Sequence, residues 1–413
     1  MKAVAFSLGC KVNKYESDSI LEDLRKQGYE ISDKLEKADV YVINTCAVTN
    51  EAEKKSRQLI ARCKKFNPKA KIYVCGCASQ KNFKQFEDKG VQLIKGVAGK
   101  SRIVSQLKNS GNNIEGISDK YEEMSFSHQS RTRAYIKIQD GCNNFCTYCI
   151  IPYLRGRSRS RDLNQIIDEV KSLDENVKEV VVVGINVSDY KIDGKKALIE
   201  VLEKLDKFGK RIRLGSLEDC IIDEEFLIRL SKLKNFCPHF HMSLQSGSSS
   251  VLKRMNRHYS AEEFYKSIQL IRKYFKNAGI TTDVIVGFPD ESEEEFNETV
   301  EFVKKVGFAS LHIFQYSHRS GTVASKMMTD LNPEIKKKRA IILEEVNKEL
   351  KHTFIAKNDT LNILIEEKEG EYYIGHSKNF IKCYVNDKNL KIGDILDVKI
   401  FKPYLDGVIA VKI

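Results

Sequence analysis

The sequence lacks the features that would place it in a membrane, in a secreted scaffold or in a repeat array. None of its apolar runs approaches the roughly 18 residues that a membrane-spanning helix requires. It has no low-complexity tract and no internal repeat at the periods of solenoid proteins. The apolar stretch at the N-terminus covers only about seven residues and runs into Lys11, which is too short for a signal peptide. We therefore expect a globular protein of the cytoplasm.

The cysteine content also argues against a disulfide scaffold. The chain has 11 cysteines among 413 residues, an odd number, and none of them sits in a short, loop-rich secreted domain. In a reducing compartment such cysteines bind metal or perform chemistry more often than they form disulfides. The cysteines are therefore the first place to look for function.

Positive charge is present in excess and is unevenly distributed. The net charge of +12 predicts a polyanionic partner. Residues 1–112 carry +10 of it, residues 113–352 carry +2, and residues 353–413 are neutral. Much of the excess falls in residues 53–71, which read as a helix rich in Lys and Arg followed by a turn. We expect the first part of the chain to face the polyanion.

The chain divides into an α/β domain, a partial barrel and a small β-barrel. Residues 1–112 alternate apolar strands (2–8, 38–45 and 71–76) with helical stretches, which predicts an α/β domain with a parallel sheet. The polar, glycine-containing stretch 109–130 has no clear periodicity, and we place a linker at residues 113–127 within it. Residues 353–413 contain short strands broken by glycine and charged turns, the pattern of a small antiparallel β-barrel.

Residues 128–352 repeat a strand–helix–loop unit. Strand-like runs begin at Ala134, Glu179, Arg211, His239, Thr282 and Ser310, and a long helix from Pro333 closes the series. Six units are too few for a closed eight-stranded barrel, so we predict an open, partial (β/α)6 TIM-like barrel. In such barrels the functional residues gather at the carboxyl ends of the strands.

Three cysteines follow the first of these strands. Cys142, Cys146 and Cys149 are spaced C-x3-C-x2-C, and thiolates are ligands for iron–sulfur clusters or zinc. No fourth Cys or His lies nearby to complete a zinc site. Three thiolates on a four-iron cluster leave one iron open to the amine and carboxylate of S-adenosyl-L-methionine. The spacing, with Tyr148 before the last cysteine, resembles the signature of the radical-SAM superfamily.

Three further cysteines each end a predicted strand of the first domain. Because the carboxyl ends of parallel strands meet at one edge of a sheet, Cys10, Cys46 and Cys77 are expected to converge there. They would form a second three-thiolate site with an open iron. Each alone would read as a buried apolar residue. Cys75 is expected to lie within its strand. The remaining four are interpreted as structural: Cys63, Cys220, Cys237 and Cys383.

Polar groups at the predicted strand ends are candidates to bind the ribose, amine and carboxylate of S-adenosyl-L-methionine. They are Gly184, Ser216, Glu218, Gln245, Arg257 and Asp283, together with Tyr148. Gly184 could equally be a strand-end turn, the others ordinary loop residues, and Arg257 an RNA contact. His239 and His241 share one strand face, but no acid or third histidine in the sequence supports a metal site. We interpret this pair as core or substrate contacts.

Two stretches are candidates for RNA contact. Four arginines, Arg155, Arg157, Arg159 and Arg161, alternate along the chain and would share one face of an extended segment that follows the C-x3-C-x2-C cysteines. Guanidinium groups there suit phosphate recognition, and the alternative is a solvated charged loop. In the last domain, Tyr372, Tyr373, Lys378, Phe380 and Lys382 mix aromatic and basic side chains, which suits stacking on unpaired bases.

At this point the chain resembles the methylthiotransferase family of radical-SAM enzymes along nearly its whole length. The motifs are GCKVNKYES, NTCAVTNEAEKKSRQ, GCNNFCTYCIIPYLRGRSRSR, HMSLQSGSSSVLKRMNR, TTDVIVGFPDESEEEF and HIFQYSHRSGT. The C-terminal barrel resembles the TRAM domain, an RNA-binding module. Asp219, Asp290 and His318 stand where the family often has Pro, Gly and Pro, which bears on fine specificity and not on class.

The resemblance implies a reaction with two [4Fe-4S] clusters and S-adenosyl-L-methionine. The cluster on Cys142, Cys146 and Cys149 would generate the radical that removes hydrogen from C2 of an adenine. The cluster on the other three cysteines would hold the sulfur that is methylated and transferred. The implied partners are tRNA and an electron donor of the flavodoxin or ferredoxin type.

The NTCAVTNEAEKKSRQ and RGRSRSR segments are most similar to the branch that acts on N6-threonylcarbamoyladenosine beside the anticodon. The alternatives, in order, are the isopentenyladenosine branch of the family and the branch that modifies an aspartate of a ribosomal protein. Outside the family, they are a radical-SAM methylase that uses the first-domain cysteines structurally, and a non-enzymatic RNA-binding iron–sulfur sensor.

Overall fold

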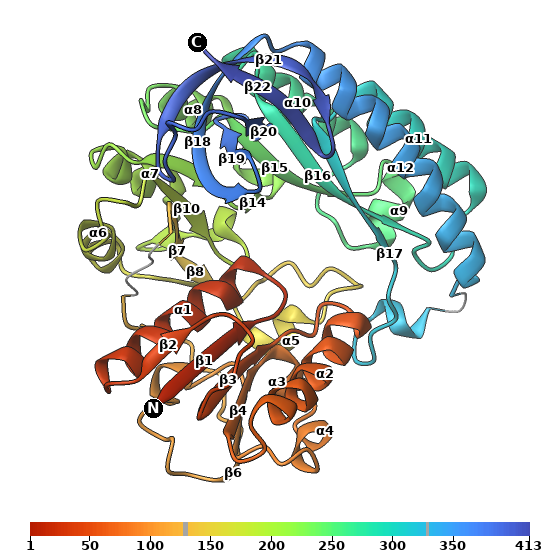
Figure 1. Cartoon of the computed structure of the whole chain (residues 1–413). Coiled ribbons are helices and arrows are strands. Elements are labelled where there is room, and N and C mark those ends of the chain that lie inside the picture. The colour runs from red at the N-terminus through yellow and green to blue at the C-terminus, as the bar shows by residue number, and fades with distance from the viewer. Residues whose placement is uncertain (127–130, 328–329) are drawn as a thin grey trace.

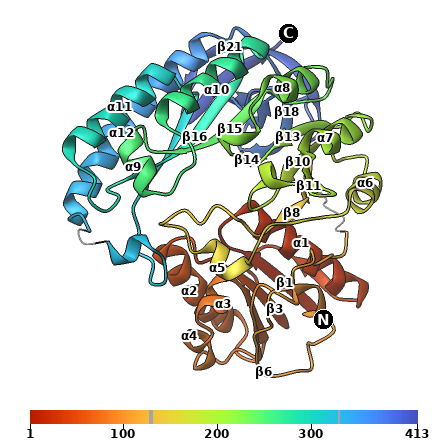
Figure 2. The ribbon, with the colours of Figure 1, turned by 180° about the vertical axis from the view of Figure 1, so that it is seen from behind.

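The structure is a computed structural model that describes residues 1–126, 131–327 and 330–413. The first sheet has six strands. Figure 1 shows it at one end of the molecule and the partial barrel as an arch at the other end, with the C-terminal barrel lying against the arch. Figure 2 shows the same arrangement from behind. The predicted boundary between linker and partial barrel, at residues 127 and 128, lies outside the described residues.

The first sheet is parallel throughout, as the sequence predicts. Its order is β2 (Glu30–Ser32), β1 (Lys2–Ser7), β3 (Val40–Thr45), β4 (Lys71–Gly76), β5 (Leu93–Lys95) and β6 (Gly111–Asn113). Helix α1 (Lys11–Lys26) packs on one face, and α2 (Asn50–Phe66), α3 (Cys77–Lys81) and α4 (Lys84–Glu87) pack on the other. Because both faces are covered, the central strands are apolar on both sides.

The partial barrel consists of six parallel strands with helices outside. The strands are β7 (Arg133–Lys137), β10 (Glu179–Val183), β13 (Arg211–Leu214), β15 (His239–Gln245), β16 (Gly279–Val286) and β17 (Ser310–Gln315). The helices are α6 (Leu163–Lys171), α7 (Leu198–Asp206), α8 (Glu224–Ser231), α10 (Ala261–Tyr274), α11 (Glu293–Val306) and the closing α12 (Pro333–Ala356). Ile212 of β13 forms an isolated parallel bridge with Phe236, which lies just before β15. The predicted partial barrel is confirmed.

Short elements connect these units. They are β8 (Gln139–Asp140), β9 (Arg159–Ser160), β11 (Lys191–Ile192), β12 (Lys195–Lys196), β14 (Ser216–Leu217), α5 (Ile151–Arg155), α9 (Ser249–Arg254) and the 3-10 turns Lys100–Arg102, Val187–Asp189, Asp219–Ile221 and Ala324–Lys326. No helix in the described part of the chain is long and apolar enough to cross a bilayer.

The C-terminal strands close into a five-stranded barrel in the order β18 (Thr360–Glu369), β19 (Tyr372–Ser377), β20 (Lys382–Val385), β22 (Gly407–Lys412) and β21 (Ile395–Tyr404). The predicted small barrel is confirmed and is consistent with a TRAM domain. Its pairing is antiparallel except between β20 and β22, which run parallel.

A buried carboxylate joins the first sheet to the partial barrel. Glu16 of α1 contacts Lys100 at 2.5 Å, Lys137 of β7 at 2.9 Å and Arg155 of α5 at 2.9 Å. Asp140 in β8 accepts from Lys137 and Arg155 as well. Although burial opposes ionisation, the three cations hold the pKa of Glu16 well below its ordinary value. The contact therefore fixes how the two parts of the chain sit together.

A second ionic contact joins the partial barrel to the C-terminal barrel. Glu179 at the start of β10 forms a bidentate pair with Arg213 at 2.7 and 3.0 Å and an ion pair with Arg133. Arg213 also donates to the carbonyl oxygens of Ser377 and Lys378 in the C-terminal barrel. Burial alone would raise the pKa of Glu179, but Arg213 and the neighbouring arginines lower it to about 2.

Replacing Glu16 should destabilise the protein strongly. Glu16→Gln removes the negative charge and leaves Lys100, Lys137 and Arg155 buried with only Asp140 to compensate, which costs about 3–5 kcal/mol. The free energy of unfolding measured in urea by circular dichroism tests this. The exposed Glu349→Gln on α12 is the control and should stay within about 0.5 kcal/mol of wild type. An equal effect of both variants would contradict a structural role for Glu16.

The stabilising effect of Glu179 should depend on pH in a defined direction. Because its folded pKa of about 2 lies below the ordinary value of 4.5, its contribution is complete above pH 4.5 and is lost as pH falls toward 2. Glu179→Gln should therefore be about 3 kcal/mol less stable than wild type at pH 7, with the gap narrowing at pH 3. Urea unfolding at both pH values measures the gap. Glu175→Gln, exposed and close in sequence, should match wild type at both, and a pH-independent gap would refute the assignment.

Candidate active site

The structure brings Cys10, Cys46 and Cys77 to one edge of the first sheet. They follow β1, β3 and β4, which are neighbours in the sheet and end in register. The three sulfurs are close enough to influence one another electrostatically. Burial raises the pKa of the Cys10 thiol and raises that of the Cys46 thiol to about 12, so these two groups need a positive partner to exist as thiolates. A metal centre supplies such a partner.

Two glycines allow the sulfurs to approach the backbone at this edge. Gly9 has φ +89°, and a side chain there would overlap the Cys46 sulfur. Gly76, directly before Cys77, has φ +108°, and a side chain would overlap the Thr45 backbone and the Asn44 side chain. Glycine tolerates both the backbone conformation and the close approach.

Positive charge from the interdomain contact lies beside the first cysteine set. Arg155 acts electrostatically on Cys10, Cys46 and Cys77. The surrounding group of three cations and two carboxylates keeps one positive charge in excess. Three soft sulfur donors next to a net cation fit a thiolate-bound, anionic iron–sulfur cluster.

Cys142, Cys146 and Cys149 share the loop between β8 and α5. The thiols influence one another, and burial raises the pKa of Cys142 to about 11 and of Cys149 to about 12. Gln139 holds the loop: its amide nitrogen donates to Gly141 O at 2.7 Å and its amide oxygen accepts from Asn186 N at 2.8 Å. Three soft donors within eight residues fit a second cluster. Gln139 was missed by sequence reasoning, since a strand glutamine carries no distinctive pattern.

Three of the predicted cofactor contacts gather at this loop. Arg257 donates to the Cys146 sulfur at 3.1 Å and forms an ion pair with Glu218. It also contacts Ser243 O at 3.1 Å and the Tyr259 hydroxyl at 3.0 Å. Tyr148 lies in the same neighbourhood, where burial and the sulfurs raise its pKa. A carboxylate and a guanidinium fixed beside this cysteine loop would suit the amine and carboxylate of an amino-acid cofactor held there.

Three others line a cavity of about 560 Å³ instead. Gly184, Ser216 and Asp283 face it from the partial barrel, and Cys10 borders it from the first sheet. A side chain at Gly184 would press on Gln139, so this glycine serves close packing of the loop. Gln245, at the end of β15, is buried and has φ +75°, a conformation rare outside glycine.

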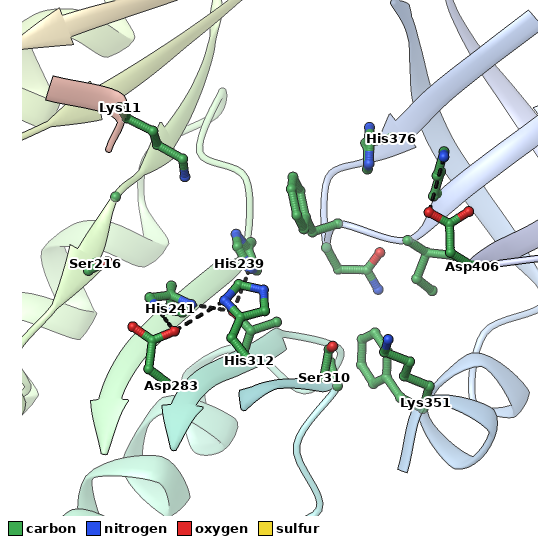
Figure 3. A pocket seen from close by; sticks show the side chains of 18 of the residues that line it. Lys11, Ser216, His239, His241, Asp283, Ser310, His312, Lys351, His376 and Asp406 are labelled. Atoms are coloured by element: carbon green, nitrogen blue, oxygen red, sulfur yellow. Dashed lines mark hydrogen bonds and ion pairs between the residues drawn. The ribbon is translucent and has the colours of Figure 1, made fainter. Parts of the chain in front are cut away.

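The cavity contains a cluster that the sequence did not reveal (Figure 3). Asp283 contacts His241 at 3.3 Å and His312 at 3.1 Å, and the ligand atoms of all three lie within 4.8 Å of one another. The prediction that no acid or third histidine joins His241 is therefore wrong. The reason is register: β16 lies between β15 and β17, and Asp283 is directly opposite His312. The rings of His239 and His241 both form a hydrogen bond with the Thr281 hydroxyl, and the His239 ring also stacks on Phe380.

The four arginines do not share one face. Arg155 and Arg161 are 1% exposed, Arg155 in the interdomain contact and Arg161 in an ion pair with Glu169. This corrects the prediction that they contact phosphate, because their guanidinium groups are occupied inside the protein. Arg157 is exposed and lies over the Phe145 ring at 4.5 Å, and Arg159 is half-buried beside it.

The candidate RNA residues of the C-terminal barrel are only partly available. Phe380 is stacked between His239 and His376 at 4.5 and 4.7 Å, so the prediction that it stacks on a base is corrected. The other four residues are half-buried: Tyr372, Tyr373, Lys378 and Lys382. Tyr372 packs near Tyr384 and Tyr404. The Lys368 ammonium lies over the Tyr373 ring, and Lys382 forms an ion pair with Asp406.

Two family models match parts of this chain. The family described as "Radical SAM superfamily" matches residues 136–303, and "Uncharacterized protein family UPF0004" matches residues 2–96. The threonylcarbamoyladenosine tRNA methylthiotransferase MtaB of Bacillus subtilis is 39% identical, covering 98% of this chain and 96% of its own. The MtaB protein of Thermotoga maritima is 34% identical over 100% and 97%. The tRNA-2-methylthio-N(6)-dimethylallyladenosine synthase of Thermosipho africanus is 34% identical over 97% of each chain.

Among solved structures, the radical S-adenosylmethionine methyltransferase TsrM from Kitasatospora setae, with cobalamin and a [4Fe-4S] cluster bound, has a TM-score of 0.54 at 12% identity. The match covers 76% of this chain and 75% of that one. The likeness establishes the shared fold.

The two cysteine sets should bind iron independently. Anaerobically reconstituted wild-type protein should hold about eight irons, whereas Cys46→Ala and Cys149→Ala should each hold about four, because each loses one ligand of a three-thiolate site. Iron and sulfide analysis measures this. Cys220→Ala, at an exposed cysteine outside both sets, should keep about eight. A full iron content in Cys46→Ala would exclude a cluster on the first set.

Proposed function

The chain belongs to the radical-SAM methylthiotransferases, and we propose that it converts N6-threonylcarbamoyladenosine at position 37 of tRNA to its 2-methylthio derivative. The observation that carries the proposal is the presence of two three-cysteine sites on the two sides of one interdomain contact. The segment from Cys149 to Arg155 connects them: it starts at the second set, and its helix α5 packs on α3, which begins at Cys77.

S-adenosyl-L-methionine and [4Fe-4S] clusters are the cofactors of this family. When bound, they supply the radical that activates the C–H bond of the adenine and the sulfur group that is inserted. We assign one cluster to Cys142, Cys146 and Cys149, and the auxiliary cluster to Cys10, Cys46 and Cys77.

The protein's own contribution is positioning. Arg257 and Glu218, fixed against each other and against the Cys146 sulfur, would orient the methionine part of the cofactor. The cavity bordered by Cys10, Ser216 and Asp283 would receive the adenosine, since it opens beside the auxiliary site. Its walls come from all three parts of the chain, so substrate binding and interdomain packing are linked.

For the tRNA we propose contacts from Arg157 and Arg159 beside the second cysteine loop and from the basic α2 of the first domain. Tyr372, Tyr373, Lys378 and Lys382 remain candidates in the C-terminal barrel. An electron donor of the flavodoxin or ferredoxin type would reduce the cluster. The threonylcarbamoyl branch is favoured because three relatives of that name reach 38–39% identity, whereas the dimethylallyl relative, like the MtaB protein of Thermotoga maritima, is 34% identical.

Nucleoside mass spectrometry of tRNA from cells that lack this gene tests the proposal. 2-Methylthio-N6-threonylcarbamoyladenosine should disappear and its precursor without the methylthio group should accumulate, because the final step is missing. The wild-type gene and Cys220→Ala should restore the product, and Cys46→Ala should not. In purified form Cys46→Ala should still cleave S-adenosyl-L-methionine, whereas Cys149→Ala should not.

Loss of the methylthio-isopentenyl nucleoside with persistence of the threonylcarbamoyl one would refute the substrate and leave the chemistry intact. If both nucleosides persisted, both of these tRNA substrates would be refuted, and the ribosomal protein would be the next substrate to test.

A further inference from the structure

We propose that the Lys11 ammonium binds the carboxylate of the substrate's N6 substituent and so selects threonylcarbamoyladenosine over adenosines with uncharged substituents. This inference rests on the function proposed above and names a specificity residue for it. Lys11 directly follows Cys10 and opens helix α1, and its side chain lines the cavity of about 560 Å³.

Lys11 carries a charge that the protein does not neutralise. Within residues 1–126, 131–327 and 330–413, the Lys11 ammonium has no hydrogen bond and no ion pair. The side chain is exposed, and Figure 3 shows it reaching into the cavity from the side of the first domain. An unpaired ammonium held in a protein cavity is a ready partner for an anionic ligand group.

The acids that line the cavity are already engaged. Asp283 is held between His241 and His312, and Asp406 pairs with Lys382 at 3.1 Å and accepts from the Tyr384 hydroxyl at 2.6 Å. Lys351, on helix α12, enters from the side opposite Lys11 (Figure 3). The described lining therefore keeps a net positive charge, which favours a ligand that brings a carboxylate.

The chemistry of the two possible substrates differs at this point. A threonylcarbamoyl group ends in an α-carboxyl group, which is ionised at neutral pH because its ordinary pKa is about 3.5. A dimethylallyl group is apolar and uncharged. A charged hydrogen bond between Lys11 and the carboxylate strengthens binding of the threonylcarbamoyl substrate. Binding of the dimethylallyl substrate is weakened, because the Lys11 ammonium loses water without gaining a partner.

The position of Lys11 also suits the reaction. It is the residue after Cys10, so a carboxylate bound to it would hold the modified base beside the auxiliary cysteine set. The same contact would thus select the nucleoside and orient it. The specificity would arise in the base-binding cavity and not from contacts with the RNA backbone.

Binding of two matched RNAs to the reconstituted protein tests this. The probes are anticodon stem-loops identical except that position 37 carries threonylcarbamoyladenosine or plain adenosine. Wild-type protein should prefer the modified RNA, and Lys11→Gln should reduce the ratio of the two affinities about tenfold. Lys11→Arg keeps the charge and should retain most of the preference. Lys26→Gln, an exposed lysine at the other end of α1, controls for the loss of one positive charge and should leave the ratio unchanged.

The outcomes separate the inference from the proposed function. A wild-type protein without any preference for the modified RNA would refute the proposed substrate itself. A clear wild-type preference that persists in Lys11→Gln would overturn the role of Lys11 alone. Equal weakening of both RNAs by Lys11→Gln would assign Lys11 to a phosphate contact and also overturn it, as would loss of iron from that variant.

Discussion

The buried Glu16 is the constraint on which the rest of the structure depends. Its carboxylate forms ion pairs with Lys100 of its own domain and with Lys137 and Arg155 of the partial barrel, and all four side chains are almost fully buried. Removing so many charges from water is tolerated only when they compensate one another closely. The interdomain geometry is therefore specified by charge pairing as well as by apolar packing, and it sets how the two cysteine sets face the same interface.

The same charges serve the chemistry that we propose. Arg155 reaches from the interdomain contact to the cysteines at the edge of the first sheet, so the group that locks the domains also compensates the thiolates. At the other set Arg257 plays the equivalent part, contacting the Cys146 sulfur while paired with Glu218. Each site thus combines three sulfurs with one buried guanidinium.

The cavity between the three parts of the chain is the feature least visible in the sequence. Its histidine–aspartate cluster forms because β16 lies between β15 and β17, which brings residues far apart in the sequence into one register. Phe380 closes the far side by stacking on His239 and His376. An aromatic residue near lysines in the sequence indicated base stacking, but the tertiary contacts assign it to packing between barrels.

The sequence by itself determined the fold class, the parallel direction of the first sheet and the partial barrel, because periodicity is a local property. It also predicted both sets of three cysteines, one from its local spacing and the other from the ends of three strands. Tertiary structure decided which charged residues are free. Arg155 and Arg161 alternate with Arg157 and Arg159 in an apparently uniform row. Arg155 is nevertheless buried against Glu16, more than 100 residues earlier, and Arg161 is buried against Glu169 of the next long helix, whereas the other two arginines are not buried. Burial and pairing of a charge depend on neighbours that only folding supplies, which is also why the unpaired Lys11 could not be recognised from its place after Cys10.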